Sequence, residues 1–280
     1  MKRQADSRTE GQELSRQILT VPSNNSLRFM MLAAHPDDEI IGASALLSRF
    51  PRSIIAYLTD GAPRDSRLWT GGPYDSREQY AKARRAEAIR ALAYAEVPKE
   101  SVCWLGAVDQ QASFEMSFFA AVVARLLEQY RPDAILTHSY EGGHPDHDAA
   151  AVVAQLAASR GRLALPIIEM TSYHARNGRC VTGEFLPSKS RGEAAPEIVI
   201  ELSESDRDRK QKMLKAHASQ QCVLENLPTD RERLRLSPGY DFSQLPHPGK
   251  LWYECLGWPM TGSLWRELAA TVGQQEPSCA

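Results

Sequence analysis

Short apolar runs alternate along the chain with segments in which apolar residues recur every three or four positions. The run from Phe29 to Ala34 is apolar throughout, which is typical of a strand buried on both faces of a sheet. Between Met116 and Tyr130, apolar residues fall 3, 4, 7, 11 and 14 positions after the first, the spacing of an amphipathic helix. Across the chain these patterns predict strands at 29–34, 54–58, 102–105, 134–137, 167–172 and 198–202, and helices at 40–49, 75–95, 116–130, 148–158 and 203–221.

The alternation of strand and helix predicts an α/β fold. We expect a mostly parallel, Rossmann-like sheet with helices on both faces, which makes three layers. One domain should cover residues 27–280, after a polar leader at 1–26 with little structure of its own. Residues 222–249 hold four prolines, so we expect 222–280 to form a loop-rich cap. The segment 61–75 has no period and predicts a long loop, which suits either a functional role or a plain surface insertion.

Composition and charge exclude several classes of protein. The chain has 280 residues with 33 basic and 35 acidic side chains, so it lacks the basic excess of a nucleic-acid binder. No run approaches the roughly 18 apolar residues of a membrane span, and we expect no membrane partner. The first 25 residues contain no apolar segment typical of a signal peptide, and the five cysteines form no C-x-x-C pair. These features favour a cytoplasmic enzyme with reduced cysteines.

Two short motifs carry the candidate chemistry. Residues 35–39 read HPDDE and residues 144–147 read HPDH, and each motif follows a predicted strand and precedes a helical segment. In a parallel sheet the loops from strand to helix lie at the carboxyl edge, where open α/β folds bind their ligands. We therefore expect the two motifs to meet at one edge of the sheet, although about 110 residues separate them.

The residue types in these motifs indicate a metal site. His35 and Asp38 are three residues apart, as are His144 and His147, so the members of each pair point the same way on a first helical turn. Two histidines and one carboxylate leave coordination positions open for water and substrate, and suit Zn²⁺ or Fe²⁺ equally. Asp37 is turned by roughly 100° from Asp38 in helical geometry and is free to act as a base. Proline and acidic residues could instead merely begin two helices, but the repeated His-Pro-Asp favours a metal site.

Together the motifs resemble those of the PIG-L/LmbE-like zinc-dependent deacetylases. Members of that family remove an N-acetyl group from glucosamine-type substrates. The resemblance spans about residues 27–221 and is weak at 61–80 and 222–280. It also rests on Thr59-Asp60-Gly61, Arg84-x-x-Glu87, Leu105-Gly106-x-x-Asp109, Lys210 and His217-Ala218-Ser219-Gln220.

The resemblance implies a role for each motif residue. Asp37 would be the general base, and a protonated His144 would stabilise the oxyanion. Some members place a tyrosine two residues before the first histidine of the second motif; here that position is Gly142, and Tyr140 is the candidate to replace it in binding the substrate. The resemblance also implies His35, Asp38 and His147 as metal ligands and Arg84 and Asp109 as substrate-binding residues.

Other polar side chains near the motifs have two interpretations each. We expect Glu39 and Asp146 to hydrogen-bond metal ligands, although Glu39 also suits the first turn of a helix. Arg84 could instead form an ordinary ion pair with Glu87. His138 ends a strand at the same edge and is expected to be a core histidine. The basic run of Arg231, Arg233 and Arg235 is expected to form a solvated face.

The leading hypothesis is a metal-dependent hydrolase that removes an N-acetyl or other N-acyl group from an amino sugar or glycoconjugate. Within the same chemistry, the substrate could be the amide of a thiol conjugate. The fold could also be a sugar- or nucleotide-binding module, although no G-x-G-x-x-G follows the first strand. A metal-binding protein without catalysis would have no use for Asp37. We expect Zn²⁺ or Fe²⁺ as the cofactor and a small glycoconjugate as the partner; the sequence leaves a homo-oligomer open.

Overall fold

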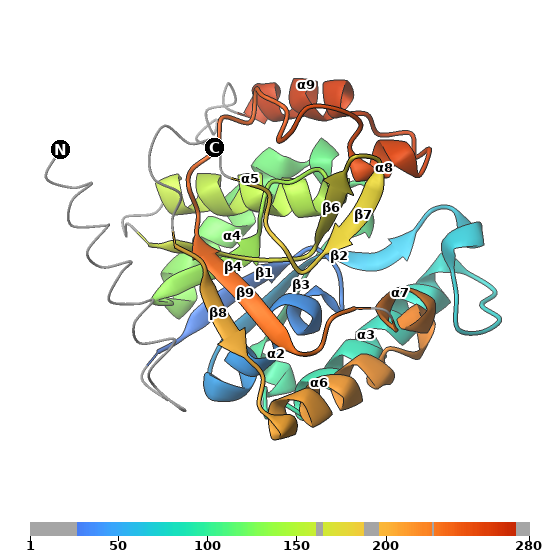
Figure 1. Cartoon of the computed structure of the whole chain (residues 1–280), viewed down its shortest axis with the longest axis vertical. Helices are drawn as coiled ribbons and strands as arrows, with labels where there is room; N and C mark the ends of the chain where they lie inside the picture. Colours follow the sequence, from blue (N-terminus) through green and yellow to red (C-terminus); the bar gives the residue numbers. More distant parts are fainter. Residues whose placement is uncertain (1–26, 161–164, 188–195, 226, 273–280) are drawn as a thin grey trace, which may run out of the picture.

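The computed structural model describes residues 27–160, 165–187, 196–225 and 227–272, so the leader expected at 1–26 lies outside it. Within these residues the central element is a seven-stranded sheet in the order β3-β2-β1-β4-β5-β9-β8 (Figure 1). The sheet contains β1 (Phe29–Ala33), β2 (Ile54–Pro63), β3 (Val102–Asp109), β4 (Ala134–His138), β5 (Ile167–Met170), β8 (Ile198–Glu201) and β9 (Arg231–Leu236). A separate hairpin consists of β6 (Tyr173–Arg176) and β7 (Arg179–Thr182).

Helices flank the sheet. The longer ones are α2 (Asp38–Arg49), α3 (Arg77–Ala93), α4 (Met116–Tyr130), α5 (Pro145–Arg160), α6 (Glu204–Ala216) and α9 (Gly262–Val272). Shorter helical turns are η1 (Ser66–Leu68), η2 (Lys99–Ser101), η3 (Ala112–Phe114), η4 (Ala218–Gln220), α7 (Gln221–Leu224) and α8 (Trp252–Cys255). None of the described helices is long and apolar enough to cross a membrane.

The strand order places both motifs at one point of the sheet. Strands β3, β2, β1, β4 and β5 are parallel, and β1 lies between β2 and β4. The chain proceeds from β1 through β2 to β3 on one side, then returns to β4 and β5 on the other. In open α/β sheets, such a reversal opens a crevice outside the carboxyl ends of the strands, where ligands bind. The α/β fold with a mostly parallel sheet is therefore confirmed.

Side chains of β1 alternate between two cores, which gives the three layers. Phe29 and Met31 pack with residues of α2, α3 and α6, whereas Met30 and Leu32 pack with residues of α4, α5 and α9. All five residues of β1 are buried. Because strand side chains alternate in direction, a strand buried on both sides needs helices on both faces, as Figure 1 shows.

The second half of the chain differs most from the sequence-based expectation. Strand β9 lies in the expected loop-rich cap, antiparallel to both β5 and β8. The Arg235 side chain on β9 is buried, and its Nε donates to Glu169 at 2.9 Å. The expected solvated face is therefore wrong for Arg235. The β6–β7 hairpin, α8 and α9 have no counterpart in the sequence-based prediction.

Several element boundaries also differ from the prediction. Helix α3 begins at Arg77, two residues later than expected, and is capped by Ser76, whose hydroxyl accepts the Gln79 N–H. Strand β2 continues past its expected end at residue 58 to Pro63 and stays paired with β3. Helix α5 begins three residues earlier than expected, which places His147 on its first turn.

Candidate active site

The two His-Pro-Asp motifs meet where β1 and β4 end. Between β1 and α2, Asp37 has a φ of 146°, a conformation that residues with side chains rarely adopt. Such a conformation costs on the order of 1–3 kcal/mol and persists only where its surroundings hold it. Its carbonyl accepts the N–H groups of Ile40 and Ile41, and its own N–H donates to Glu39 Oε2 at 3.1 Å. The start of α2 therefore fixes a strained turn at the predicted base.

Three predicted ligands form a buried group that can hold a metal ion. His35 Nδ1 lies 3.1 Å from Asp38 Oδ2, and His147 Nε2 lies 3.2 Å from Asp38 Oδ1. Ligand atoms of the three residues all lie within 4.8 Å of one another. Although it lies near Asp38, His147 Nε2 makes no well-aligned hydrogen bond within the described residues, as expected of a nitrogen that binds another ligand. Two imidazoles and one carboxylate fit a divalent Zn²⁺ or Fe²⁺ ion.

Charge within this group favours an ionised carboxylate. Burial alone would raise the pKa of Asp38, but His147, His138 and His35 hold it well below its usual value. His138 accepts the Ala34 N–H at 3.0 Å, and its ring stacks on that of His147 with centroids 4.0 Å apart. His138 is thus a core histidine that also packs against a candidate ligand.

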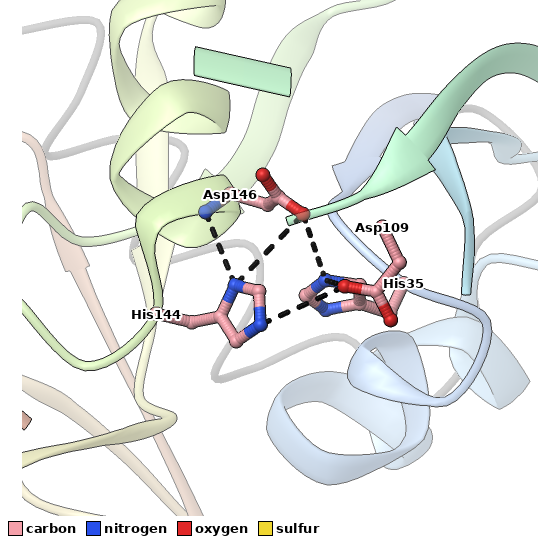
Figure 2. A group of neighbouring side chains, drawn as sticks. All are labelled: His35, Asp109, His144 and Asp146. Atoms are coloured by element: carbon pink, nitrogen blue, oxygen red, sulfur yellow. Dashed lines mark hydrogen bonds and ion pairs between the residues drawn. The ribbon is translucent and has the colours of Figure 1, made fainter. Parts of the chain in front are cut away.

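The other ring nitrogen of His35 faces two carboxylates (Figure 2). Nε2 lies 3.2 Å from Asp109 Oδ1 and 3.3 Å from Asp146 Oδ2. The backbone N–H of Gln110 donates a hydrogen bond to Asp146 Oδ2 at 2.6 Å and so fixes the Asp146 carboxylate. Burial opposes protonation, but the Asp109 carboxylate raises the pKa of His35 well above its usual value. With a proton on Nε2 between the two carboxylates, His35 would bind a metal through Nδ1 once that atom has lost its own proton. The orienting contact expected of Asp146 is therefore present, and Asp109 shares it.

Arg84 positions the predicted base. Its Nη1 donates to Asp37 Oδ2 at 3.1 Å, and both side chains are buried. Burial raises the pKa of Asp37 to about 6, although the Arg84 charge opposes the shift. Glu87 does not pair with Arg84; it accepts the N–H and hydroxyl of Ser219 at 3.0 and 2.6 Å. The Arg84–Glu87 alternative is therefore wrong, and a contact of Arg84 with the substrate stays a prediction.

Glu39 forms its hydrogen bond with Asp37, the predicted base, and not with a candidate metal ligand. It is fully buried, and its Oε2 accepts the Asp37 N–H. Burial raises the pKa of Glu39 to about 8, so this carboxyl group carries a proton at neutral pH. Within the described residues no hydrogen bond joins it to His35, Asp38 or His147. The contact expected between Glu39 and a ligand is thus replaced by a contact with the backbone of Asp37.

His144 is a neutral hydrogen-bond donor. Its Nδ1 accepts the Asp146 N–H at 3.1 Å, which places the ring proton on Nε2. Burial and the nearby ring of His35 lower the pKa of His144 well below its usual value. Nε2 lies 3.7 Å from Asp109 Oδ1. The expectation of a protonated His144 is corrected: the ring is neutral, yet it still offers an N–H.

Three residues near the site have no signal in the sequence. Ser172 Oγ lies 3.4 Å from His147 Nδ1, and the Tyr173 ring lies 5.2 Å from the His147 ring. The Trp258 ring meets that of His144 edge to face at 4.8 Å. Burial and the carboxylates of the site raise the pKa of Tyr173 well above its usual value. In the sequence, Tyr173 and Trp258 stand out only as aromatic residues in segments without a periodic pattern, which is too weak a signal to place them at the site.

Tyr140 is held by contacts within the protein. Its hydroxyl donates to the Gln244 carbonyl at 2.9 Å, and its ring packs against Trp265 with centroids 5.0 Å apart. A Cβ at Gly142 would lie 2.6 Å from Leu251 Cδ2, and Gly142 has a φ of +70°, so a larger side chain would be strained there. The hydroxyl of Tyr140 is thus already bonded to Gln244, and its contact with the substrate stays a prediction.

A glycine at position 143 is required by the β6–β7 hairpin. A Cβ at Gly143 would lie 1.9 Å from the Tyr173 carbonyl oxygen, a clash with backbone. Gly143→Ala should therefore destabilise the protein by about 1–3 kcal/mol or more, measured by denaturant unfolding. Gly72→Ala is the control, because its Cβ would meet only the Tyr74 ring at 3.7 Å. Equal stability of the two variants would show that the hairpin does not close over this loop.

Known proteins resemble this chain in sequence and in fold. Residues 30–158 match the PIG-L family model, described as GlcNAc-PI de-N-acetylase. The zinc-inhibited form of teicoplanin deacetylase Orf2 superposes with a TM-score of 0.59 at 14% identity, over 75% of this chain and 97% of that chain. N,N′-diacetylchitobiose deacetylase from Pyrococcus horikoshii, in complex with its inhibitor MPG, gives 0.56 at 15% identity, over 88% and 96%. GalB, the 4-carboxy-2-hydroxymuconate hydratase of Pseudomonas putida KT2440, gives 0.50 at 18%, over 71% and 82%.

Proposed function

Residues 30–158 match the PIG-L family model, and we propose that the chain is a metal-dependent hydrolase of this family that removes an N-acetyl or other N-acyl group from an amino sugar or glycoconjugate. The observation that carries this proposal is one buried arrangement. His35, Asp38 and His147 gather as a ligand group, and Asp37 stands beside them paired with Arg84. A ligand group with an adjacent base that does not bind the metal is what hydrolysis by activated water requires.

The chain's own side chains divide the chemistry among them. When bound by His35, Asp38 and His147, a Zn²⁺ or Fe²⁺ ion would act as a Lewis acid that lets water attack near neutral pH. Asp37 accepts the proton of the attacking water and passes it to the leaving amine, which must not depart as an anion. His144 offers its Nε2–H to the carbonyl oxygen on which negative charge develops.

The comparisons support an N-acetyl substrate without fixing it. Two proteins with this fold are deacetylases, of teicoplanin and of N,N′-diacetylchitobiose. A third is a hydratase, so the fold alone does not decide the reaction. What favours amide hydrolysis here is the family match, since residues 30–158 include both motifs and Arg84.

The proposal is tested by metal content and acetate release in the same preparation. We expect about one metal ion per chain and release of acetate from N-acetylglucosamine or its glycoconjugates that a chelator abolishes. His147→Ala should lose both the metal and the activity, because it removes one of three ligands. His247→Ala is the control, since His247 contacts Pro248 and no residue of the ligand group; it should keep both.

Two results would contradict the proposal. Absence of bound metal after reconstitution with zinc and with iron would mean that both motifs only begin helices. A metal that binds without hydrolysis of any N-acetyl or other N-acyl amino sugar or glycoconjugate would keep the ligand group and refute the proposed hydrolase. In that case hydration of an unsaturated acid is the next reaction to assay, because a hydratase shares this fold.

A further inference from the structure

The β6–β7 hairpin brings one partly exposed side chain to the site, that of Tyr173. The residues on either side, Ser172 and His174, are buried, whereas Tyr173 retains access to solvent. Its ring lies 5.2 Å from that of the candidate ligand His147. The hairpin lies outside residues 30–158, so the family match does not assign it a role.

Backbone contacts hold Tyr173 in this position. Its carbonyl packs on Gly143, the residue that precedes His144. Tyr173 pairs with Thr182 across the hairpin, and the Gly183 N–H donates to the Ser172 carbonyl at 2.9 Å. A side chain on a paired strand that is fixed to the motif loop can present a functional group precisely enough to bind a ligand.

The hydroxyl of Tyr173 has no protein partner among the described residues. By contrast, Tyr140 donates to the Gln244 carbonyl, and Tyr240 donates to Glu169 at 2.7 Å. A phenol hydroxyl without a protein partner, on a partly exposed residue whose ring borders the candidate ligand His147, is available to donate to a group bound at the site.

We propose that Tyr173 binds the substrate, with its hydroxyl donating a hydrogen bond to the carbonyl oxygen of the acyl group. This inference rests on the proposed function for the identity of that group. The acyl end is the part of the substrate that must approach His147 and Asp37, and Tyr173 borders His147. An amide substrate and its carboxylate product both offer an sp² oxygen there as the acceptor.

The test uses two matched substitutions in the metal-loaded full chain. Tyr173→Phe removes only the hydroxyl, and Tyr140→Phe removes a hydroxyl that is bonded to Gln244. We expect Tyr173→Phe to lower kcat/KM for acetate release by about tenfold and to weaken acetate binding, measured by calorimetry, by about three- to tenfold. Metal content and Tm should stay at wild-type values. Tyr140→Phe should leave kcat/KM and acetate affinity within about twofold.

Each outcome decides between the two proposals. If Tyr173→Phe matches the wild type in both kcat/KM and acetate affinity, the inference is wrong and the Tyr173 ring lines the site without its hydroxyl binding the substrate. If the wild-type protein releases no acetate, the proposed function fails, while acetate affinity still decides the role of the hydroxyl. If acetate does not bind the wild-type protein measurably, no carbonyl-type acceptor is held beside Tyr173 and the inference is overturned.

Discussion

Replacing Asp37 with asparagine will lower kcat by about 10²–10⁴-fold while the metal content stays at the wild-type value. Asparagine keeps the shape of the side chain, and its oxygen can still accept from Arg84 Nη1, which lies 3.1 Å from Asp37 Oδ2. It cannot take a proton from water, so the loss should appear in kcat. The measurement is kcat for acetate release from N-acetylglucosamine or its glycoconjugates, with metal analysis of the same sample.

The control for this prediction is Asp208→Asn. Asp208 forms an exposed ion pair with Lys212 on α6, so its loss should leave kcat unchanged. Activity of Asp37→Asn within about threefold of the wild type would refute Asp37 as the base. Loss of the metal from Asp37→Asn would instead make Asp37 a ligand, contrary to the arrangement in which His35, Asp38 and His147 form the ligand group.

Replacing Lys210 with methionine will lower the free energy of unfolding by about 3–5 kcal/mol. Lys210 is 1% exposed, and its Nζ donates to Glu232 Oε1 at 2.9 Å and to the Ile41 carbonyl at 2.8 Å. The substitution leaves a buried carboxylate on β9 without its counter-ion, and it frees a carbonyl of α2. Urea unfolding at neutral pH measures the loss.

A second substitution separates loss of the ion pair from loss of packing. Lys210→Met with Glu232→Gln removes both charges, and the glutamine can still accept from Ser44 Oγ, 2.6 Å from Glu232 Oε1. The double variant should therefore be more stable than Lys210→Met alone. Lys212→Met, on the exposed face of the same helix, is the control and should change stability by less than about 1 kcal/mol. A Lys210→Met protein as stable as this control would refute the prediction.

Local pattern predicts the first half of the chain well. The apolar run at β1 and the helical spacing of α4 are both found where the sequence places them. Each depends on side chains that lie close together in the sequence. Strand β9 is different, because it carries Glu232 and Arg235 at buried positions. These charges are paired with Lys210 and Glu169, which lie at least 22 residues away, so no local pattern shows that they are inside.

The sequence by itself determined that two His-Pro-Asp motifs follow parallel strands and that such strands carry their ligands at the carboxyl edge. The resemblance of these motifs to a known family then implied His35, Asp38 and His147 as ligands, with Asp37 as the base. Only the tertiary structure decided which ring nitrogen of His144 carries the proton, because the Asp146 backbone N–H donates to Nδ1 and leaves the proton on Nε2. The tertiary structure also places the Tyr140 hydroxyl against the Gln244 carbonyl and brings the Tyr173 ring beside His147. A side chain from a distant hairpin reaches the motif through long-range packing, which residue order and spacing do not encode.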